Sequence, residues 1–266
     1  MIGPRKVDRP LVLYGYGKLG HLAEEIFKEL RIPVTAIITK SDLKDLEDDY
    51  WNKLRKDFLL AICVATEPYN QVIAPLVAAG WTDIVSVWDI IEAYPKVRIG
   101  NGWFAGPFLD EEYRECGRIL DLLEDGISRT HYLEHLDYRQ YRRGHPLFVI
   151  EPPEQDSLPS TLADIRRRQK IILWSDCHHT FWNSYGDSGT VYIHQEGKEM
   201  ETLMANIEVF RKYRPKIQVS SYHSRDGLWK IPKYLMDNLP DYKWTFRLHA
   251  FMGQAAYIYG TPKERI

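Results

Sequence analysis

The 266-residue sequence has little of several features that mark particular classes of protein. Three cysteines are too few for a disulfide scaffold, so we expect reduced thiols and a cytoplasmic protein. No apolar run approaches the ~18 residues of a membrane span, and the charged start of the chain lacks the apolar segment of a signal peptide. Because 35 basic residues stand against 37 acidic ones, the basic footprint of a nucleic-acid-binding protein is missing.

The remaining composition is typical of a globular protein. Hydrophobic residues make up 44% and charged residues 27%, and the length favours one large or two modest domains. Aromatic residues are abundant at 13%, with 8 Trp and 17 Tyr. Aromatic side chains line sugar sites, but they also supply large buried area, so we expect most of them to pack in cores.

The first hundred residues alternate between strand and helix patterns. Short apolar runs predict strands, and apolar residues at helical spacing predict helices between them. The strands are expected over 11–14, 34–38, 58–65 and 84–87, and the helices over 19–30 and 72–79. Such alternation indicates a parallel sheet with right-handed crossovers. Residues 1–98 are therefore predicted to form a Rossmann-like α/β domain.

A cluster of glycine and proline between Pro95 and Pro107 breaks this pattern and predicts a domain boundary. Two helices are expected within 110–141, and we interpret residues 99–145 as a helical linker. Exposed segments of this composition are preferred sites of proteolysis. The first cuts in limited proteolysis are therefore expected between Pro95 and Pro107.

The last segment, residues 146–266, returns to α/β alternation. Strands are expected over 147–150, 170–174, 191–193 and 217–222, and a helix over 228–239 carries Pro232 in its first turn. Another helix is predicted to bury one face made of Met200, Leu203, Met204, Ile207 and Phe210. Residues 244–248 and 255–259 flank a short Gly-containing connection, which predicts an antiparallel hairpin.

Three glycines make the most familiar motif near the start. Gly15, Gly17 and Gly20 follow a strand and open a helix, as in the fingerprint of dinucleotide-binding domains, and are candidate cofactor-binding residues. The acid expected at the end of the second strand is missing: that strand ends before Lys40, with Asp42 beyond. We therefore favour glycines that serve packing and bind no dinucleotide tightly.

Two further motifs carry little weight. Asp176–His179 precedes His194 and Glu196, but adjacent histidines on an extended segment point to opposite faces, so no metal site is predicted. Gly186–Gly189 has the letters of a serine-protease nucleophile loop without its context, and is interpreted as a polar turn.

Candidate catalytic residues follow two strands of the last segment. His194 and Glu196 come after one strand, and His223 after the next. Ligands of open α/β sheets bind outside the carboxyl ends of the strands, so these side chains are predicted to share a cleft. The alternatives remain open: Glu196 and Glu199 are also suited to a helix N-terminus, and His223 to a buried structural role.

The order of motifs from 190 to 260 resembles the C-terminal half of FkbM-type methyltransferases, which use S-adenosylmethionine to methylate sugar hydroxyls. The motifs are His194–Glu199, Arg214-Pro215, Ser220–His223, Leu228–Pro232 and Arg247–His249. Residues 125–132 and the glycine motif also resemble the linker and the extra N-terminal Rossmann-like domain of some members. The resemblance thus extends over most of the chain.

The resemblance implies a reduced class I methyltransferase-like sheet that ends in the antiparallel hairpin. It implies that S-adenosylmethionine is the cofactor, with Glu151 at its ribose, and that Glu199, Trp229, Arg247 and His249 bind substrate. Two residues depart from the family pattern: His194 replaces an aspartate and Leu248 a histidine. The glycine-rich cofactor loop is not found between Arg143 and Val191, so we expect weak or absent binding of S-adenosylmethionine.

The predicted fold is thus two Rossmann-like α/β domains joined by a helical linker. The predicted function, taken from the resemblance, is O-methyl transfer to a sugar or glycan precursor in polysaccharide biosynthesis, or a degenerate form of it. The alternative is a non-catalytic sugar- or nucleotide-binding module, or a subunit supporting an active partner. An oxidoreductase role for the first domain is weakest, because no catalytic Tyr-x-x-x-Lys pair follows. The sequence leaves a homo-oligomer open.

Overall fold

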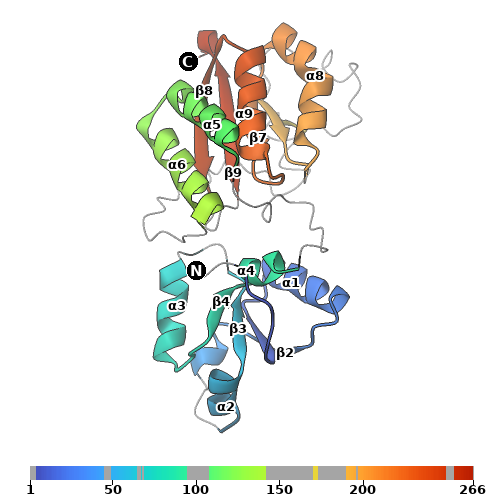
Figure 1. Cartoon of the computed structure of the whole chain (residues 1–266). Helices are drawn as coiled ribbons and strands as arrows, with labels where there is room; N and C mark the ends of the chain where they lie inside the picture. Colours follow the sequence, from blue (N-terminus) through green and yellow to red (C-terminus); the bar gives the residue numbers. More distant parts are fainter. Residues whose placement is uncertain are drawn as a thin grey trace. The chain divides into compact units, whose positions relative to one another are not determined.

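The computed structural model describes residues 4–44, 49–64, 67, 69–94, 108–141, 170–172, 190–195, 197–249 and 255–265. The chain divides into two compact units, Met1–Ile99 with Tyr141–Phe148 and Gly100–Gln140 with Val149–Ile266. Each unit contains its own sheet (Figure 1). No helix in these residues is long and apolar enough to cross a membrane.

The first unit has a four-stranded parallel sheet in the order β2-β1-β3-β4. Its strands are β1 (Leu11–Tyr14), β2 (Val34–Ile38), β3 (Leu59–Ile62) and β4 (Ile84–Ser86). Its helices are α1 (Lys18–Glu29), α2 (Asp49–Asp57), α3 (Tyr69–Ala78) and α4 (Val87–Glu92), with a 3-10 turn at Asp42–Lys44. This parallel α/β arrangement is Rossmann-like, as the alternating pattern predicted.

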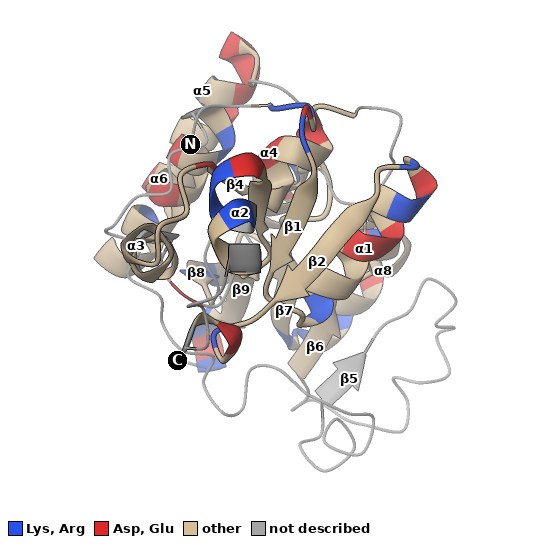
Figure 2. Ribbon diagram, turned by 90° about the horizontal axis from the view of Figure 1, so that it is seen from below, with Lys and Arg blue, Asp and Glu red and all other residues tan. Residues whose placement is uncertain are grey.

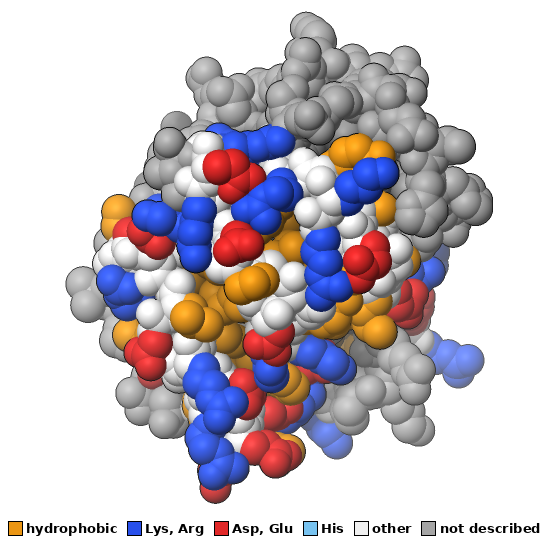
Figure 3. Space-filling model, turned by 90° about the horizontal axis from the view of Figure 1, so that it is seen from above, with side chains coloured by type: hydrophobic (Ala, Val, Ile, Leu, Met, Phe, Trp, Pro, Cys, Tyr) orange, Lys and Arg blue, Asp and Glu red, His pale blue; other side chains and the backbone are white. Residues whose placement is uncertain are grey.

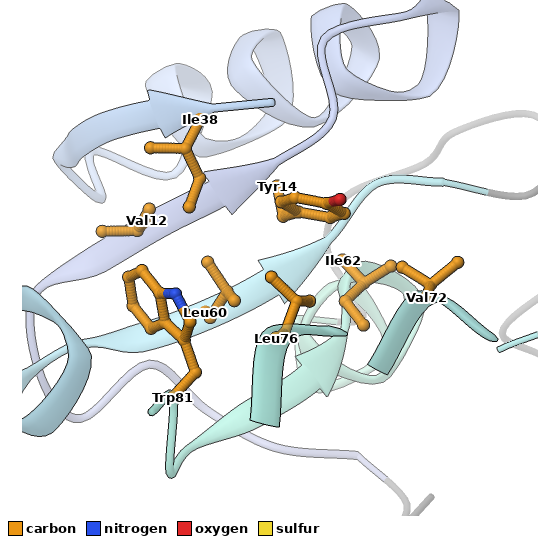
Figure 4. Close-up of a cluster of buried hydrophobic side chains, with 8 residues drawn as sticks. All are labelled: Val12, Tyr14, Ile38, Leu60, Ile62, Val72, Leu76 and Trp81. Carbon is orange, nitrogen blue, oxygen red and sulfur yellow. The ribbon is translucent and has the colours of Figure 1, made fainter. Parts of the chain in front are cut away.

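Apolar side chains on one face of this sheet pack against α3 and against Trp81, which lies three residues beyond the end of that helix. The cluster consists of Val12, Tyr14, Ile38, Leu60, Ile62, Val72, Leu76 and Trp81 (Figure 4). Neither β1 nor β2 contains a charged residue, and the ribbon of Figure 2 shows charged residues along the helices and turns instead. Burial of these side chains removes apolar surface from water and stabilises the unit.

The second unit has a five-stranded mixed sheet in the order β5-β6-β7-β9-β8. The strands are β5 (Lys170–Ile172), β6 (Thr190–Ile193), β7 (Lys216–Ser220), β8 (Tyr242–Leu248) and β9 (Ala256–Pro262), with a 3-10 turn at Lys263–Arg265. The first three are mutually parallel, whereas β9 runs antiparallel to both of its neighbours. The expected hairpin is present as β8 and β9.

In the described residues, the helices that accompany this sheet are α5 (Asp110–Leu122), α6 (Gly126–Tyr141), α8 (Glu199–Tyr213) and α9 (Gly227–Asn238). Residues 100–140, most of the segment predicted as a linker, belong to this unit. Arg225, two residues before α9, donates two hydrogen bonds to Glu112 of α5, at 2.5 and 2.8 Å. Arg247 of β8 holds Asp125, just before α6, at 2.9 Å. Helices α5 and α9 lie side by side (Figure 1).

Pro232 lies in the second turn of α9, not the first as predicted, because the helix begins at Gly227. A proline there cannot donate to the carbonyl four residues earlier, which belongs to Leu228. The buried hydroxyl of Tyr132 on α6 donates to that carbonyl at 3.0 Å. Tyr132 thus links α6 to α9 at the Leu228 carbonyl, which Pro232 leaves without an intrahelical hydrogen bond.

One predicted core position of the second unit is wrong. Leu203, Ile207 and Phe210 of α8 are buried as expected, but Met204 is 61% exposed. Side chains three and four residues apart cover only part of a helix, and Met204 lies beyond the edge of that face. The strand expected at 147–150 lies outside the described residues.

Candidate active site at the carboxyl edge of the second sheet

Strand order brings the candidate residues of the second unit to one edge. β6 and β7 are parallel neighbours, so their carboxyl ends meet there, and His194 and His223 follow these ends. Because β9 is antiparallel to β7, its first residues reach the same edge, and Tyr257 pairs with Ser220. The rings of His194 and His223 are 4.5 Å apart between centroids, at an angle of 83°.

His223 is held by a buried carboxylate at the start of α8. Its Nδ1 lies 2.5 Å from Oε1 of Glu199, and both side chains are almost fully buried, at 7% and 1% exposure. The hydroxyl of Ser220 donates to the same oxygen at 2.7 Å. Glu199 is thus placed to fix the imidazole, whereas the resemblance implied a substrate-binding role.

Backbone N–H groups of the loop between β6 and α8 complete the surroundings of Glu199. The Gln195 amide donates to Oε1 and the Gly197 amide to Oε2, each at 2.9 Å. Gly197 has a φ of 104°, in the left-handed region that favours glycine, and this conformation turns the loop beneath the carboxylate. Both oxygens of Glu199 thus receive hydrogen bonds from backbone N–H groups, as an ionised carboxylate requires.

The pKa of the Glu199 carboxyl reflects this environment. Burial alone raises the pKa, but the hydrogen bond and charge of His223 lower it, and so do the bonds from Gln195 and Ser220. The result is a pKa of about 2. Glu199 is therefore ionised at neutral pH and acts as an acceptor of hydrogen bonds only.

His194 has a different set of neighbours. It is half-buried, and its ring lies parallel to Tyr192, 5.9 Å away between centroids at an interplanar angle of 9°. Its Nδ1 lies 3.3 Å from the hydroxyl of Tyr257, which lies 3.2 Å from the hydroxyl of Tyr192. Hereafter the imidazole cluster means His194, His223, Glu199, Ser220, Tyr192 and Tyr257.

The other residues expected at the substrate are spread more widely. His249 is close to the imidazole cluster, 5.8 Å from the ring of Tyr257, and its Nε2 lies 2.6 Å from the hydroxyl of Tyr259. Arg247 is bonded to Asp125 and Ser128 and ties β8 to α6.

Trp229 lies elsewhere, at the contact between α9 and α5. It is half-buried beside Glu112, whose pKa is lowered mainly by its bond with Arg225, with a smaller effect from the indole. Arg247 and Trp229 thus have structural partners in the described part of the chain.

Backbone geometry explains why positions 15 and 20 are glycine. A Cβ on Gly20 would lie 2.3 Å from the carbonyl oxygen of Gly15, and Gly15 itself has a φ of 97°. Gly17 has open space around it and caps α1. The carboxylate of Asp42 accepts bonds from the N–H and hydroxyl of Thr39, at 2.6 and 2.7 Å. The nearest acid beyond β2 is thus engaged with its own turn.

Sequence reasoning missed three members of the imidazole cluster. Ser220 stands three residues before His223, a spacing that could have suggested contact at a strand end. Nothing in the sequence links Tyr257 with His194, because 63 residues separate them. Tyr192 is one of 17 tyrosines, with no local pattern that distinguishes it.

Several sequence predictions lie outside the described residues: Glu196, Glu151, Asp176–His179, Gly186–Gly189 and the expected boundary between Pro95 and Pro107. Among the residues that are described, no group of three or more His, Cys, Asp or Glu side chains is arranged to hold a metal ion.

The chain was also compared with known proteins. No family model and no curated protein matches the sequence. The fold is similar to a crystal structure described as methyltransferase FkbM from Methylobacillus flagellatus KT, with a TM-score of 0.54 and 13% identity. The match covers 96% of this chain and 91% of that chain. The structure therefore has a methyltransferase-like fold.

Proposed function

We propose that the imidazole cluster binds a hydroxyl group of a sugar or glycan and that His223 removes its proton during S-adenosylmethionine-dependent O-methyl transfer. The observation that carries this proposal is the buried pair of Glu199 and His223, 2.5 Å apart at the carboxyl edge of the sheet. Ligands of open α/β sheets bind at this edge. The similarity of fold to a methyltransferase supports the reaction class.

The proton step follows from the state of Glu199. An ionised carboxylate only accepts hydrogen bonds, so Nδ1 of His223 carries a hydrogen and donates it to Oε1. In the neutral ring, Nε2 then has the lone pair that takes the proton of the acceptor hydroxyl. The imidazolium that forms is stabilised by the charge of Glu199, and the electron pair of the broken O–H bond stays on oxygen.

The described residues fit the acceptor better than the cofactor. Tight binding of an adenosyl group needs a carboxylate for the ribose and close approach of the backbone. Glu199 is the carboxylate of the imidazole cluster, and both of its oxygens already accept hydrogen bonds. The steps proposed here therefore concern the hydroxyl and its proton, and positioning of the two reactants supplies the remaining rate.

The test is methyl transfer from labelled S-adenosylmethionine to a panel of sugars and glycan precursors by the full chain. Loss of a general base lowers the rate by about 10²–10⁴-fold, so His223→Ala is expected to fall in that range. The matched control is His21→Ala, because His21 lies on α1 in the first unit, where it is exposed and its ring is tilted against that of Tyr16. It is expected to stay within about twofold of the natural protein, as surface changes usually do.

Calorimetric titration separates the alternatives. Sugar binding that His223→Ala weakens, without methyl transfer from any acceptor, would favour the non-catalytic sugar-binding module. Methyl transfer at an undiminished rate in His223→Ala would refute the assignment of the base. Transfer that is lost in His223→Ala and retained in His21→Ala supports the proposal.

A further inference from the structure

The outer edge of β8 is covered by the segment that leads from α5 into α6. β8 is the last strand in the order of the second sheet, and within that sheet it pairs with β9. The N–H and C=O groups on the other side of an edge strand need different partners. The N–H of Glu124 donates to the carbonyl of Trp244 at 2.9 Å, beside an isolated bridge between Leu123 and Trp244. This segment therefore takes the place of a further strand at the start of the edge.

Side chains of α6 continue the cover along β8. The N–H of Phe246 donates to the hydroxyl of Ser128 at 3.0 Å, and the N–H of Leu248 donates to Nδ1 of His131 at 3.2 Å. Both acceptor side chains are fully buried. They are one helical turn apart, so successive turns of the helix meet alternate residues of the strand. Hereafter the latch means these two hydrogen bonds, from Phe246 to Ser128 and from Leu248 to His131.

The bond from Leu248 fixes the state of His131. A backbone N–H can only donate, so Nδ1 of His131 carries a lone pair, whatever groups its Nε2 contacts. The ring in this structure is therefore neutral. A protonated imidazole has a hydrogen on both nitrogens and cannot accept a bond at either. Protonation of His131 and its bond to Leu248 thus exclude each other.

We propose that His131 makes the latch sensitive to pH: its Leu248 bond is closed while the imidazole is neutral and opens when the imidazole takes up a proton. The open form binds a proton that the closed form does not, so the closed form is favoured less as the pH falls. Histidine ordinarily titrates at about pH 6.5, and each pH unit below that changes the ratio of closed to open forms about tenfold. The bond from Phe246 is expected to persist, because a serine hydroxyl does not titrate.

Other ionisable groups lie near His131 in the described part of the chain. Arg247 of β8 donates to Asp125, before α6, at 2.9 Å. Burial raises the pKa of the Asp125 carboxyl, but the bond from Arg247 and those from the first turn of α6 lower it overall, so this pair keeps both charges above pH 5. His135 is buried one turn further along α6, and Tyr257 of β9 lies opposite Arg247 in the register. Burial raises the pKa of Tyr257, so the phenol stays neutral.

Glu134 of α6 titrates over the same range as the latch, but with the opposite effect. Burial raises the pKa of its carboxyl to about 7. A group whose pKa is raised in the folded protein stabilises the folded form as the pH falls. Protonation of Glu134 therefore cannot produce the loosening expected from His131.

Exposed charges add little to the contact between α6 and β8. Lys243 pairs with Glu124 beside the bridge, and the two side chains are 39% and 44% exposed. Figure 3 shows basic and acidic side chains interspersed over one face of the second unit. Exposed pairs are screened by solvent and contribute little. The buried bonds of the latch are therefore the contacts that decide whether the edge stays covered.

The latch holds the strand end that leads toward the imidazole cluster. His249 follows Leu248, and its N–H donates to the carbonyl of Ala255 at 3.0 Å. Tyr257 of the cluster comes two residues later, at the start of β9. Release of Leu248 is expected to loosen this end of the hairpin. Any effect on acceptor binding rests on the proposed function, whereas the latch itself does not.

Amide hydrogen exchange of the full chain, followed by NMR, compares the two bonds of the latch within one molecule. Protection factors, corrected for the intrinsic effect of pH on exchange, are measured at pH 7.5 and 5.5, a range in which Glu199 stays ionised. The protection of the Leu248 N–H is expected to fall about tenfold relative to that of Phe246. An unchanged ratio would overturn the proposal.

Two substitutions on α6 form a matched pair. His131→Asn removes the titrating group and keeps an acceptor oxygen near the position of Nδ1, so the ratio of the two protection factors is expected to change less than about twofold between these pH values. His135→Asn removes a buried histidine one turn away and is expected to retain the tenfold change. A tenfold change that persists in His131→Asn, or is lost in His135→Asn, would contradict the assignment to His131.

The outcomes separate the latch from the proposed function, because exchange needs no substrate. A constant ratio in a natural protein that transfers methyl groups would overturn the latch alone. A tenfold change without methyl transfer would support the latch and refute the catalytic proposal. If His131→Asn fails to fold, ¹⁵N–¹H correlation of the natural protein at pH 7.5 still decides. A lone pair at Nδ1 of the ring next to the Leu248 amide supports the latch, and a hydrogen there overturns it.

Discussion

Glu199→Gln tests whether the buried carboxylate stabilises the second unit through its charge. The substitution keeps the shape of the side chain and removes the charge that His223, Ser220 and two backbone amides surround. An amide presents one oxygen and one NH₂ group, so at least one buried donor meets another donor. A loss of stability is expected without a change of fold.

The magnitude follows from the pKa. In the unfolded chain the carboxyl has its ordinary pKa of 4.5, and in the folded protein the pKa is about 2. A difference of this size corresponds to about 3 kcal/mol of unfolding free energy. Because the folded pKa is lowered, this contribution is complete above about pH 4.5 and is lost as the pH falls toward 2.

Urea unfolding of the full chain provides the measurement. Pulsed hydrogen exchange with mass spectrometry is the suitable readout, because peptides from α8 and β7 report on the second unit alone. With a urea dependence of about 2 kcal/mol per M, the midpoint of these peptides is expected about 1.5 M lower in Glu199→Gln at pH 7. The difference is expected to shrink steadily as the pH is lowered from 4.5.

The matched control is Glu208→Gln on the same helix. Glu208 is 75% exposed and paired with Arg211, and exposed pairs of this kind contribute about 0–1 kcal/mol. Its midpoint is expected to stay close to that of the natural protein at every pH. An unchanged midpoint in Glu199→Gln at pH 7, or a loss equally large at pH 3, would refute the assignment of an ionised, stabilising carboxylate.

Three further predictions concern packing and the first unit. Gly20→Ala is expected to destabilise the first unit by about 2 kcal/mol, because the added Cβ would lie 2.3 Å from a carbonyl oxygen. Gly17→Ala is expected to cost less than about 1 kcal/mol, because the space around Gly17 is open. Urea unfolding compares the two variants, and equal losses of stability would contradict the backbone explanation. Tyr132→Phe is expected to lower the unfolding free energy by about 1–2 kcal/mol, because the Leu228 carbonyl loses its hydrogen-bond donor. The loss is expected to be smaller in a Pro232→Ala background, where a helix N–H again reaches that carbonyl. Additive losses in the double variant would argue against this coupling between Tyr132 and Pro232. Fluorescence titration with NADH and NADPH is expected to show no saturable micromolar binding, since Asp42, the acid beyond β2, is hydrogen-bonded within its own turn. Saturable binding would show that the glycines at 15, 17 and 20 do more than permit close packing.

Most strands and helices could be predicted from the sequence, since apolar runs and helical spacing are local signals, but the helix α2 (Asp49–Asp57) was not among those expected. The region after β4 shows where such signals fail. Residues 84–87 have the apolar pattern of a strand, but Ser86 accepts a hydrogen bond from the N–H of Trp88 and starts α4 at Val87. A serine followed by apolar residues suits both a strand and a helix cap, so the choice depends on tertiary packing.

The site could be predicted only in part. The rule that parallel strands end at one edge was enough to bring His194 and His223 together, and the rings are indeed adjacent. The partner of His223 could not be foreseen from the sequence, because Glu199 at the start of a helix suits an exposed position equally well. The role of Glu199 depends on the loop at Gly197, whose left-handed backbone conformation accompanies a hydrogen bond from its N–H to the carboxylate.

The strand order of the second sheet has a consequence for synthesis of the chain on the ribosome. The final strand, β9, lies between β7 and β8, which are both made before it. Until residues 256–262 emerge, β7 and β8 each lack a neighbour, and Tyr257 cannot reach the histidines. The first sheet, by contrast, is complete once β4 is made, roughly 10–35 s earlier at ordinary rates of translation. Two strand edges therefore remain open late in synthesis, and this is the interval in which the nascent protein is most exposed to wrong pairing and aggregation.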